Sequence, residues 1–436
     1  MDDIYLIEIR LARTKWRIKK SIFSIGRMFG IEDYLEQHPH VTIFGPLVLN
    51  EEVTAGTLLE TIEQVAQKYS MVPYIIAGCE KREGFHGSVI AFPVTPSVSL
   101  RDLTTEIAGS LQSITTSLNG WDAQPDQKWF HVTIANRLDT RRASKIFAVL
   151  STLNHYPRPS ENTLPGIRSR VFSFLDRLMQ KGKKFAIRPV LLDETGLRVT
   201  VMHGQEILAE YDLLRKQWIR ADELRDIRSW MQTLEQFRRE AGFELQGPMH
   251  APDDTVFLIA DLHLGHTNII GYCSRPFLSD NADEMDTVLV RNWNYTIPVT
   301  GQVYHMGDLR YGNGAPPARF YRDQLNGNIT FIRGNHDDGE LETVPYITLE
   351  HEGIRFLLIH DPADVPPDFN GWVVHGHHHN NDLLNYPFID FDKKRINVSA
   401  EVVGYVPVSL SELCAIIKEP GTARTPILLR YPYIMP

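Results

Sequence analysis

The sequence contains little cysteine and no long apolar run. Only Cys79, Cys273 and Cys414 are present among 436 residues, and three cysteines so far apart cannot form a disulfide framework, which favours a reducing compartment. No apolar run approaches the roughly 18 residues that a membrane-spanning helix needs. The opening MDDIYLIEIRLARTKWRIKK has acidic residues first and basic residues after a short apolar stretch, which is the reverse of a secretory signal. We therefore expect a cytoplasmic protein that does not associate with membranes.

The overall composition is that of an ordinary globular protein, but charge is divided unevenly. Apolar residues make up 43% and charged residues 23%, and a chain of this length predicts two or three domains. Residues 1–250 contain 32 Lys and Arg against 30 Asp and Glu, whereas residues 251–436 contain 13 against 24. An acidic half repels a phosphate-rich substrate unless cations are bound in it. The distribution therefore suggests metal in the C-terminal half.

The N-terminal half alternates between strand-like and helix-like patterns. Apolar β-prone runs and apolar spacings of three and four predict, in chain order, a strand at 4–11, a helix at 58–69, strands at 74–80 and 88–94, and helices at 99–114 and 141–153. Ser99 or a near neighbour is a suitable cap for the helix at 99–114. This order predicts an α+β domain in which helices pack on antiparallel sheet.

Two further segments follow before the sequence pattern changes. Residues 187–219 predict a meander of three β-type runs, with turns at DETG (193–196) and HGQ (203–205). Residues 221–243 carry one apolar stripe and predict an interdomain helix, followed by a turn-rich linker. We therefore expect a first domain at 1–220, a helical linker at 221–252 and a second domain at 253–436.

The second predicted domain consists of short apolar runs that each end in polar or metal-capable residues. These runs are 256–260, 302–306, 329–333, 354–360, 371–376 and 396–400. Strands buried on both faces, with their chemistry at the C-terminal ends, are typical of layered α/β or β-sandwich enzymes.

The tetrapeptide HVTI occurs twice, at His40–Ile43 and at His131–Ile134. Alternate side chains of a strand share a face, so the His and Thr of each copy should face a cleft while Val and Ile are buried. Two such strands would place two imidazoles and two hydroxyls around one point. One neutral histidine could then accept a proton and one protonated histidine could donate a proton, while Thr42 and Thr133 donate hydrogen bonds to phosphate oxygens. A single His-x-Thr is usually only part of a strand, but two identical copies 91 residues apart favour a metal-free phosphodiester site.

Residues 1 to about 220 resemble the two-histidine phosphoesterases, whose best-known branch is the 2′-5′ RNA ligase-like (LigT-like) family. HVTIFGPL is close to the first motif of that family, and HVTIAN resembles the second. The resemblance implies a bilobal α+β fold and cleavage of 2′,3′-cyclic or related phosphodiesters at RNA or nucleotide ends. Only His40, Thr42, His131 and Thr133 carry over as site residues. The predicted meander lies beyond the family's core, and its role stays open.

A basic segment near the N-terminus is a candidate for substrate binding. RLARTKWRIKK (residues 10–20) combines basic side chains with a tryptophan, which could hold phosphates and stack a base. The candidate contacts are Arg13, Lys15, Trp16 and Arg17. The alternative interpretation is a solvated, positively charged loop.

The C-terminal half contains a series of metal-capable side chains in DLHLGH, HMGDL, GNHDD, IHDP and HGHHH. The candidate ligands are Asp261, His263, Asp308, Asn335, His360, His377 and His379. Mixed carboxylate, imidazole and amide ligands suit manganese, iron or zinc better than calcium or magnesium. Seven ligands are too many for one tetrahedral ion, and they fit two ions that share a carboxylate.

Residues 253–436 resemble the calcineurin-like metallophosphoesterases, whose motif order is D-x-H, GD, GNH[DE], H, GH-x-H. The resemblance implies a four-layer β-sandwich of α/β type with a dinuclear centre that holds two divalent transition-metal ions. Manganese is the first expectation, with iron, zinc and nickel as alternatives, and the N-terminal domain needs no cofactor. The pattern assigns one ion to Asp261, His263 and His379 and the other to Asn335, His360 and His377, with Asp308 bridging.

Further side chains near this motif series have less defined roles. The resemblance places His336 outside the metal shell, where it would protonate the leaving group or stabilise the transition state. His266 and Asn268 are candidate contacts of the substrate or of the ligands. His375 and His378 crowd the HGHHH segment and make the choice of ligands within it less secure.

The two resemblances together predict a bifunctional RNA end-processing enzyme. The first domain would open a 2′,3′-cyclic phosphate to a monoester, usually the 2′-phosphate in this family, and the second would remove that phosphate. One alternative keeps this chemistry but acts on small nucleotides such as ADP-ribose cyclic phosphate or cyclic nucleotides. Another makes the first domain a non-catalytic RNA-binding module that delivers RNA to a metal-dependent nuclease. The expected partners are RNA ends or nucleotides, and no obligate protein partner is evident.

Overall fold

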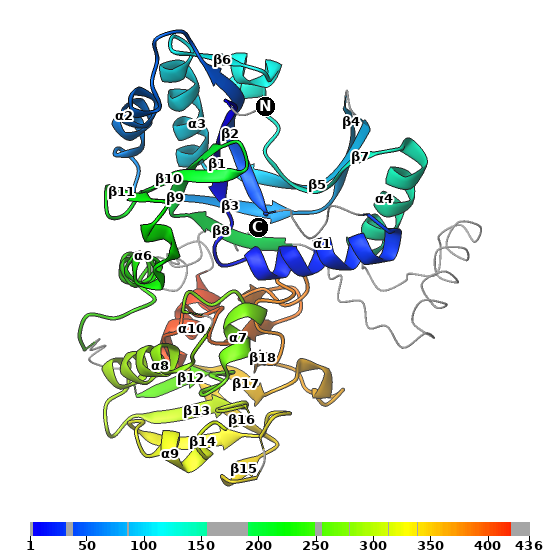
Figure 1. The fold of residues 1–436 in the computed structure, drawn as a ribbon. Coiled ribbons are helices and arrows are strands. Elements are labelled where there is room, and N and C mark those ends of the chain that lie inside the picture. Colours follow the sequence, from blue (N-terminus) through cyan, green and yellow to red (C-terminus); the bar gives the residue numbers. More distant parts are fainter. Residues whose placement is uncertain are drawn as a thin grey trace. The chain divides into compact units, whose positions relative to one another are not determined.

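The structure is a computed structural model, and the chain divides into two compact units, Met1–Thr233 and Leu234–Pro436 (Figure 1). The boundary lies within helix α6 (Ile227–Glu240), inside the segment expected to be a helical linker. Residues 187–190 of the predicted meander, 249–252 of the predicted linker and 253–254 of the predicted second domain lie outside the described residues. Among those described, no helix combines the length and apolar character needed to cross a membrane. The structure describes residues 3–31, 38–84, 87–154, 191–248, 255–278, 280–312, 314–337 and 339–419.

The first unit contains two antiparallel sheets, and each sheet includes one HVTI strand. The first sheet has the order β11-β10-β9-β1-β2-β6, and the second has the order β4-β5-β3-β8, with β7 paired to β5. The strands are β1 (Tyr5–Arg10), β2 (His40–Leu49), β3 (Val72–Ala77), β4 (Glu80–Gly84), β5 (Gly87–Pro96), β6 (Thr115–Ser117), β7 (His131–Leu138), β8 (Leu191–Gly196), β9 (Arg198–His203), β10 (Glu206–Asp212) and β11 (Gln217–Arg220).

Helices cover these sheets and close one continuous apolar core. Helix α3 packs on β2, β3 and β5, and α2 packs on α3, while α4 lies against β4 and β5 (Figure 1). The side chain of Ser97 caps α3, as expected for Ser99 or a near neighbour. The helices of this unit are α1 (Lys15–Phe29), α2 (Ala55–Ala66), α3 (Val98–Leu111) and α4 (Thr140–Asn154), with short 3-10 turns η2 (Gly120–Ala123), η3 (Pro125–Gln127) and η4 (Glu223–Arg225).

Helix α1 was not expected, because its basic residues suggested only a charged segment or loop. Ile18, Ile22 and Ile25 recur at spacings of four and three and are all buried, so the helix has one apolar face. The helix is capped at its C-terminal end by Gly30, which has a left-handed φ of 61° and donates its N–H to the carbonyl of Gly26. The basic residues lie on the opposite, more exposed face. Because the prediction considered only their charge, the helical spacing of the apolar residues was missed.

The meander completes both sheets of the first unit. DETG was expected to be a turn, and this was wrong: these residues end β8, which pairs with β3, and β9 begins at Arg198 and pairs with β1. The chain thus passes from one sheet to the other at Gly196 and Leu197. The expected turn at HGQ is confirmed, because β9 ends at His203 and β10 begins at Glu206. This segment is therefore integral to the first unit's core.

The second unit contains two five-stranded sheets of mixed direction. Strands β12, β13, β14 and β15 are parallel in the order β15-β14-β13-β12-β21, and the other sheet has the order β16-β17-β18-β20-β19 with β17, β18 and β20 parallel. The strands are β12 (Val256–Ile259), β13 (Gln302–Met306), β14 (Asn328–Ile332), β15 (Thr343–Val344), β16 (Tyr346–His351), β17 (Ile354–Ile359), β18 (Trp372–His375), β19 (Ile389–Asp390), β20 (Arg395–Asn397) and β21 (Val408–Ser409).

Because these neighbouring strands run parallel, their C-terminal ends meet at one edge of each sheet. A parallel bridge between Ala260 and Ser399 joins the ends of β12 and β20 and brings the two edges together. The expected strands at 256–260, 302–306, 329–333, 354–360, 371–376 and 396–400 are confirmed within one to three residues. The helices are α7 (Thr267–Tyr272), α8 (Asp283–Thr296), α9 (Ala318–Arg322) and α10 (Leu410–Lys418), with the 3-10 turn η5 (Pro362–Asp364).

The crossing point at Gly196 generates a prediction about stability. A Cβ at Gly196 would lie 2.6 Å from Cγ2 of Ile9 and 2.7 Å from Cγ2 of Val72, so Gly196→Ala should lower the free energy of unfolding by about 1–3 kcal/mol. Gly109→Ala is the matched control, because nothing lies within 4 Å of a Cβ there and alanine favours a helix by about 0.5–1 kcal/mol over glycine. Denaturant titration of the full chain measures both. Equal effects of the two substitutions would contradict this packing.

Candidate functional site

The two HVTI strands present their side chains as the alternation predicts. Val41 and Ile43 in β2, like Val132 and Ile134 in β7, are 0–1% exposed, while the His and Thr of each motif are only partly buried. Strands β2 and β7 contact each other although they belong to different sheets. His40 lies close enough to His131 for its charge to lower the pKa of that residue. The structure therefore brings His40 and His131 together.

Both imidazoles are held by the same kind of hydrogen bond. Nδ1 of His40 donates to the carbonyl of His38 at 2.8 Å, and Nδ1 of His131 donates to the carbonyl of Trp129 at 2.9 Å. A carbonyl oxygen can only accept, so the proton must be on Nδ1 in both rings. The neutral form of each ring then leaves Nε2 free to accept a proton, and the charged form makes Nε2 a donor.

His131 lies in a layered stack that favours its neutral form. Its ring is stacked on Trp129 with centroids 3.8 Å apart, and the guanidinium of Arg82 lies 4.1 Å from the centroid of that indole. Burial lowers the pKa of His131, the hydrogen bond to Trp129 opposes this, and the charges of His40, Arg82 and Lys128 lower the pKa further. His131 therefore remains neutral to a lower pH than an exposed histidine.

His40 has a different electrostatic environment. A carboxylate oxygen of Glu8, which is 2% exposed, lies 3.5 Å from Nδ1 of His40, and the other accepts a hydrogen bond from Nε of Arg10 at 2.9 Å. His38 precedes the motif, and burial followed by the charges of Arg10, Lys19, Lys15 and His40 lowers its pKa to about 4. Among the residues that the structure describes, only one of the two site histidines thus has a carboxylate beside it.

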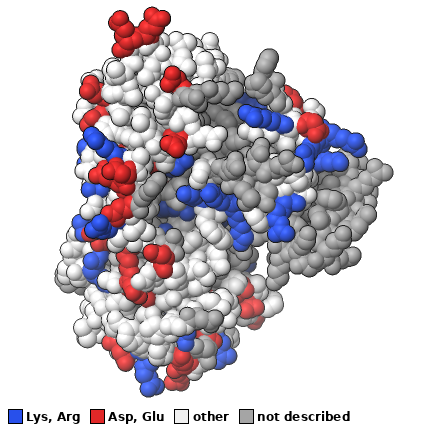
Figure 2. Space-filling view, in the orientation of Figure 1, with Lys and Arg blue, Asp and Glu red and all other residues white. Residues whose placement is uncertain are grey.

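The four candidate substrate contacts lie at the N-terminal end of α1, and their surroundings differ. Arg13 is tied down, because it donates to Asp193 at 3.1 Å and lies 3.7 Å from a carboxylate oxygen of Glu194. Lys15 and Trp16 are exposed, and Nζ of Lys20 lies 4.7 Å from the centroid of the Trp16 ring. Arg17 lies on the same helix and is partly buried. Figure 2 shows Lys and Arg gathered over α1 and α4, and the charges of Lys15 and Lys19 on α1 act on His38.

In the second unit, all seven candidate ligands follow the ends of strands. Asp261 and His263 follow β12, Asp308 follows β13, Asn335 follows β14, His360 follows β17, and His377 and His379 follow β18. Five of them have left-handed φ angles between 51° and 70°: Asp261, His263, Asp308, His377 and His379. Such backbone is unfavourable for residues other than glycine and concentrates at functional sites.

One half of the cluster consists of Asp261, His263 and His379, whose ligand atoms lie within 4.8 Å of one another. All three side chains are buried, and neither ring nitrogen of His263 nor Oδ1 of Asp261 has a hydrogen-bond partner among the described residues. Burial, with His379 adding to it, lowers the pKa of His263 well below its usual value, so its ring is neutral. Buried polar atoms are rarely left unpaired, and these match the donor set of a transition-metal ion.

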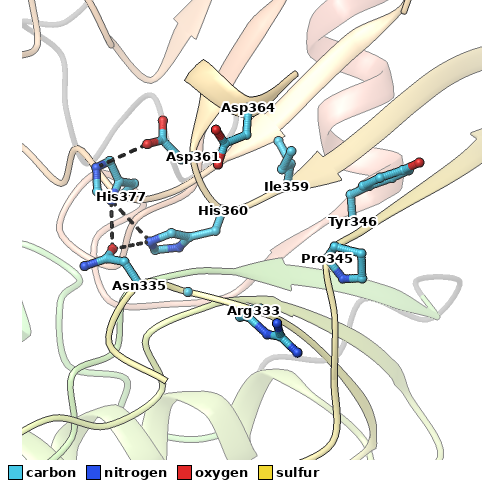
Figure 3. A pocket seen from close by; sticks show the side chains of 10 residues that line it. Arg333, Asn335, Pro345, Tyr346, Ile359, His360, Asp361, Asp364 and His377 are labelled. Carbon is cyan, nitrogen blue, oxygen red and sulfur yellow. Dashed lines mark hydrogen bonds and ion pairs between the residues drawn. The ribbon is translucent and has the colours of Figure 1, made fainter. Parts of the chain in front are cut away.

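The other half consists of Asn335, His360 and His377, which converge in Figure 3. Nδ1 of His360 donates to the carbonyl of Met306 at 2.8 Å, so Nε2 of the neutral ring is an acceptor. That Nε2 lies 2.9 Å from Oδ1 of Asn335 and 3.3 Å from Nδ1 of His377. Acceptor atoms this close to one another fit the ligand shell of a cation.

Asp308 lies between the two halves. Its Oδ2 is 3.5 Å from Nε2 of His263 and 3.6 Å from Nε2 of His360. Burial, followed by the neighbouring Asp261 carboxylate, raises the pKa of Asp308 to about 7. A carboxylate oxygen equidistant from both halves is where a bridging ligand is expected.

Three glycines in the motifs allow this convergence. A Cβ at Gly307 would lie 2.5 Å from Nδ1 of His360, and a Cβ at Gly334 or Gly376 would overlap the carboxylate of Asp308 or Asp261. Each glycine directly precedes a candidate ligand. Glycine is therefore required in GD, GN and GH, because the backbone at each of these positions passes directly against the side chain of another candidate ligand.

The sequence analysis missed Arg275 and Glu401, which support the cluster. Arg275 is fully buried and donates to the carbonyls of Asp261 and Leu262 at 2.8 Å each, and Nε donates to Glu401 at 2.7 Å. Glu401 also accepts from Nδ1 of His379 at 3.1 Å. Burial raises the pKa of Glu401, but Arg275 and His379 outweigh it and lower the pKa to about 2. The sequence signal was a lone arginine in an otherwise uncharged stretch, residues 267–279.

The other candidate residues of this unit differ in whether they contact the cluster of candidate metal ligands. His336 is exposed, donates its N–H to Asp308 at 2.9 Å, and its ring lies 4.3 Å from that of Tyr311. His266 lies 5.5 Å from the His263 ring, whereas Asn268 is exposed on α7. His375 bonds the carbonyl of Gly376, and His378 stacks on Tyr386 at 3.4 Å. Within HGHHH, His377 and His379 therefore face the cluster.

A family model identifies one domain of this chain. Residues 12–167 match the model of the 2'-5' RNA ligase superfamily, which confirms the resemblance that the two HVTI motifs indicated. The uncharacterized protein MJ1445 of Methanocaldococcus jannaschii is 45% identical over 173 residues, which cover 39% of this chain and 95% of that protein. The resemblance of the second unit to the calcineurin-like enzymes stays a prediction.

Two solved structures show weak likeness. A protein of unknown function, AQ665 from Aquifex aeolicus, has 23% identity and a TM-score of 0.30, and the match covers 37% of this chain and 98% of that one. Kluyveromyces marxianus Usb1 with uridine monophosphate has 14% identity and a TM-score of 0.26, with coverage of 47% and 96%. On the sequence matches, this chain belongs to the same family as the Methanocaldococcus protein and carries a 2'-5' RNA ligase superfamily domain at residues 12–167.

Proposed function

We propose that the protein is a bifunctional RNA end-processing phosphoesterase. In this proposal the first unit opens a 2′,3′-cyclic phosphate without metal, and the second unit removes the resulting phosphate with metal. The observation that carries it is the pair of imidazoles on β2 and β7, each held through Nδ1 by a carbonyl with Nε2 left for proton transfer. Membership of residues 12–167 in the 2'-5' RNA ligase superfamily and the basic surface over α1 support RNA as the substrate (Figure 2).

The different surroundings of the two histidines suggest their roles. His131, whose pKa is lowered by burial and nearby cations, accepts the proton of the attacking water through Nε2. Water oxygen bonds to phosphorus as the bond to the 3′ oxygen breaks. His40, with the Glu8 carboxylate 3.5 Å away, donates its Nε2 proton to that leaving oxygen. The product is a 2′-phosphate beside a 3′-hydroxyl, and Thr42 and Thr133 donate hydrogen bonds to the non-bridging oxygens.

The second unit fits a dinuclear metallophosphoesterase of the calcineurin-like type. Asp261, His263 and His379 would hold one ion and Asn335, His360 and His377 the other, with Asp308 shared between them. Divalent transition metals, manganese first, would supply Lewis acidity and neutralise phosphate charge when bound. His336, exposed beside Asp308, would donate a proton to the leaving oxygen. The product of the first step is a monoester, which is the type of group such a centre hydrolyses.

RNA that ends in a 2′,3′-cyclic phosphate tests the two steps separately. With chelator present, we expect a phosphomonoester to accumulate, and with Mn²⁺ we expect inorganic phosphate to be released. His40→Ala or His131→Ala should slow only the first step, by about 10²–10⁴-fold for loss of a general acid or base. Asp308→Ala or Asn335→Ala should block only the second. A first step that requires metal, or that survives both histidine substitutions, would show the division of labour to be wrong.

The pH profile of the first step tests the role of His131. Arg82→Ala removes a positive charge that lowers the pKa of His131, so that pKa should rise and the neutral base should be lost at a higher pH. We expect the acidic limb of kcat/KM for the cyclic phosphate to move upward by a few tenths of a pH unit. Arg101→Ala, an exposed arginine on α3, should leave the limb unchanged. A downward shift would mean that His131 does not set this limb.

Metal binding can be measured without any substrate. Equilibrium dialysis of the full chain against Mn²⁺ should give two ions per chain, and saturating metal at 100 times Kd should stabilise the protein by about 2.7 kcal/mol per site. Asp308→Asn should weaken binding of both ions, because this carboxylate lies 3.5 and 3.6 Å from the two halves. Asp323→Asn, an exposed carboxylate after α9, is the control. Two ions bound equally well by Asp308→Asn would rule out the shared position.

A further inference from the structure

A cavity of about 380 Å³ opens beside the Asn335, His360 and His377 half of the ligand cluster. Figure 3 shows these three side chains converging on one side of it, with Pro345 and Tyr346 on the other. The cavity is thus continuous with the place where a phosphate would lie if the second unit acts as proposed. Its volume is at the lower end of the range of small-molecule pockets, roughly 300–1,000 Å³, so it takes one small group and not a folded polymer.

The wall remote from the cluster offers a planar aromatic surface. Tyr346, the first residue of β16, is 46% exposed, and it is paired in the sheet with Ile359 on β17. Ile359 is 5% exposed and packs with Leu357 and Val373, so this side of the cavity has a fixed apolar base. An exposed tyrosine ring above an ordered apolar base suits stacking of a flat, uncharged ring system.

The charged groups of the cavity restrict which flat ligand fits. Asp361 lies 3.5 Å from Nε2 of His377 and caps η5 by accepting from the N–H of Ala363, so its carboxylate is already engaged. Asp364 is exposed at the same rim, where it can accept hydrogen bonds but repels a second phosphate. Arg333, which donates to Thr343 at 3.2 Å, is the cation among the lining residues. The part of the ligand beside Tyr346 and Asp364 should therefore be neutral, flat and rich in hydrogen-bond donors.

From this arrangement we infer that the cavity binds one nucleoside, with its base stacked on Tyr346 and a base amino group or ribose hydroxyl donating to Asp364. A phosphate on that nucleoside then faces Asn335, His360 and His377. The inference rests on the proposed metal-dependent step for the position of the phosphate, but the nucleoside pocket itself needs no metal. The nucleoside can be a free nucleotide or the terminal residue of an RNA, and the two sources share the same chemistry.

Binding of nucleosides to the metal-free full chain tests the pocket independently of catalysis. Isothermal titration with adenosine, cytidine, guanosine and uridine should show binding, and ribose should not bind measurably. Tyr346→Ala should weaken nucleoside binding at least about fivefold, the loss expected for one stacked base, whereas Tyr346→Phe should retain it. Asp364→Asn should also weaken it. Phe320→Ala, which removes an exposed aromatic ring on α9, is the matched control and should have no effect.

A competition experiment separates the two sources of the nucleoside. A linear tetranucleotide that displaces the bound nucleoside would identify an RNA end as a ligand, and failure to displace it would identify a free nucleotide. A circular RNA of the same bases has no terminal nucleoside and should not compete. The inference is overturned if circular RNA competes as well as linear RNA, if ribose binds as well as the nucleosides, or if Tyr346→Ala binds like the unsubstituted protein. Because no metal is added, a failed metal site leaves these results unchanged.

Discussion

Three close approaches of backbone to side chain set the geometry of the second unit. Gly307, Gly334 and Gly376 lie where a Cβ would overlap a neighbouring ligand, so the strand ends can come together only with glycine at these positions. The residues that follow Gly307 and Gly376 have left-handed backbone, which is unfavourable and must be held by surrounding structure. Arg275 provides part of that support by binding the carbonyls of Asp261 and Leu262 from a fully buried position. Loss of the Arg275 side chain would therefore free the loop that carries Asp261 without removing any candidate ligand side chain.

In both units, a hydrogen bond from Nδ1 orients the imidazole rings. Nδ1 of His40, His131 and His360 donates to a main-chain carbonyl, and Nδ1 of His379 bonds the Glu401 carboxylate. In each of these four rings the orienting hydrogen bond leaves Nε2 available to exchange a proton or to bind a metal ion. The same tautomer therefore suits both proton transfer and metal binding. What differs is the surroundings: Glu8 beside His40, an indole and a guanidinium beside His131, and several carboxylates, among them Asp261, Asp308 and Glu401, at the second cluster.

Local patterns predicted the parts of the structure that depend on neighbouring residues in the sequence. The alternation of HVTI predicted the faces of β2 and β7, and the strand ends predicted where the candidate ligands lie, because both follow from backbone geometry alone. Helix α1 was missed because its charges concealed the period of Ile18, Ile22 and Ile25. DETG was misinterpreted because its turn-like composition is overridden by pairing with β3. Arg275 and Glu401 are 126 residues apart, and nothing local marks either as a partner of His379.

Charge pairing in the interior sets Asp261 and Asp308 apart from the other buried carboxylates. Among the described residues, the buried carboxylates Glu8, Asp122, Glu194, Glu210, Asp212, Glu244 and Glu401 each have a Lys or Arg nitrogen within 4.0 Å. Asp261 and Asp308 are as deeply buried, but in the described part of the chain only histidines lie at that distance from them. A buried carboxylate without a cation is costly, and the raised pKa of Asp308 reflects this. The two exceptions to the pairing rule thus lie together, where a pair of divalent ions would supply the missing positive charge.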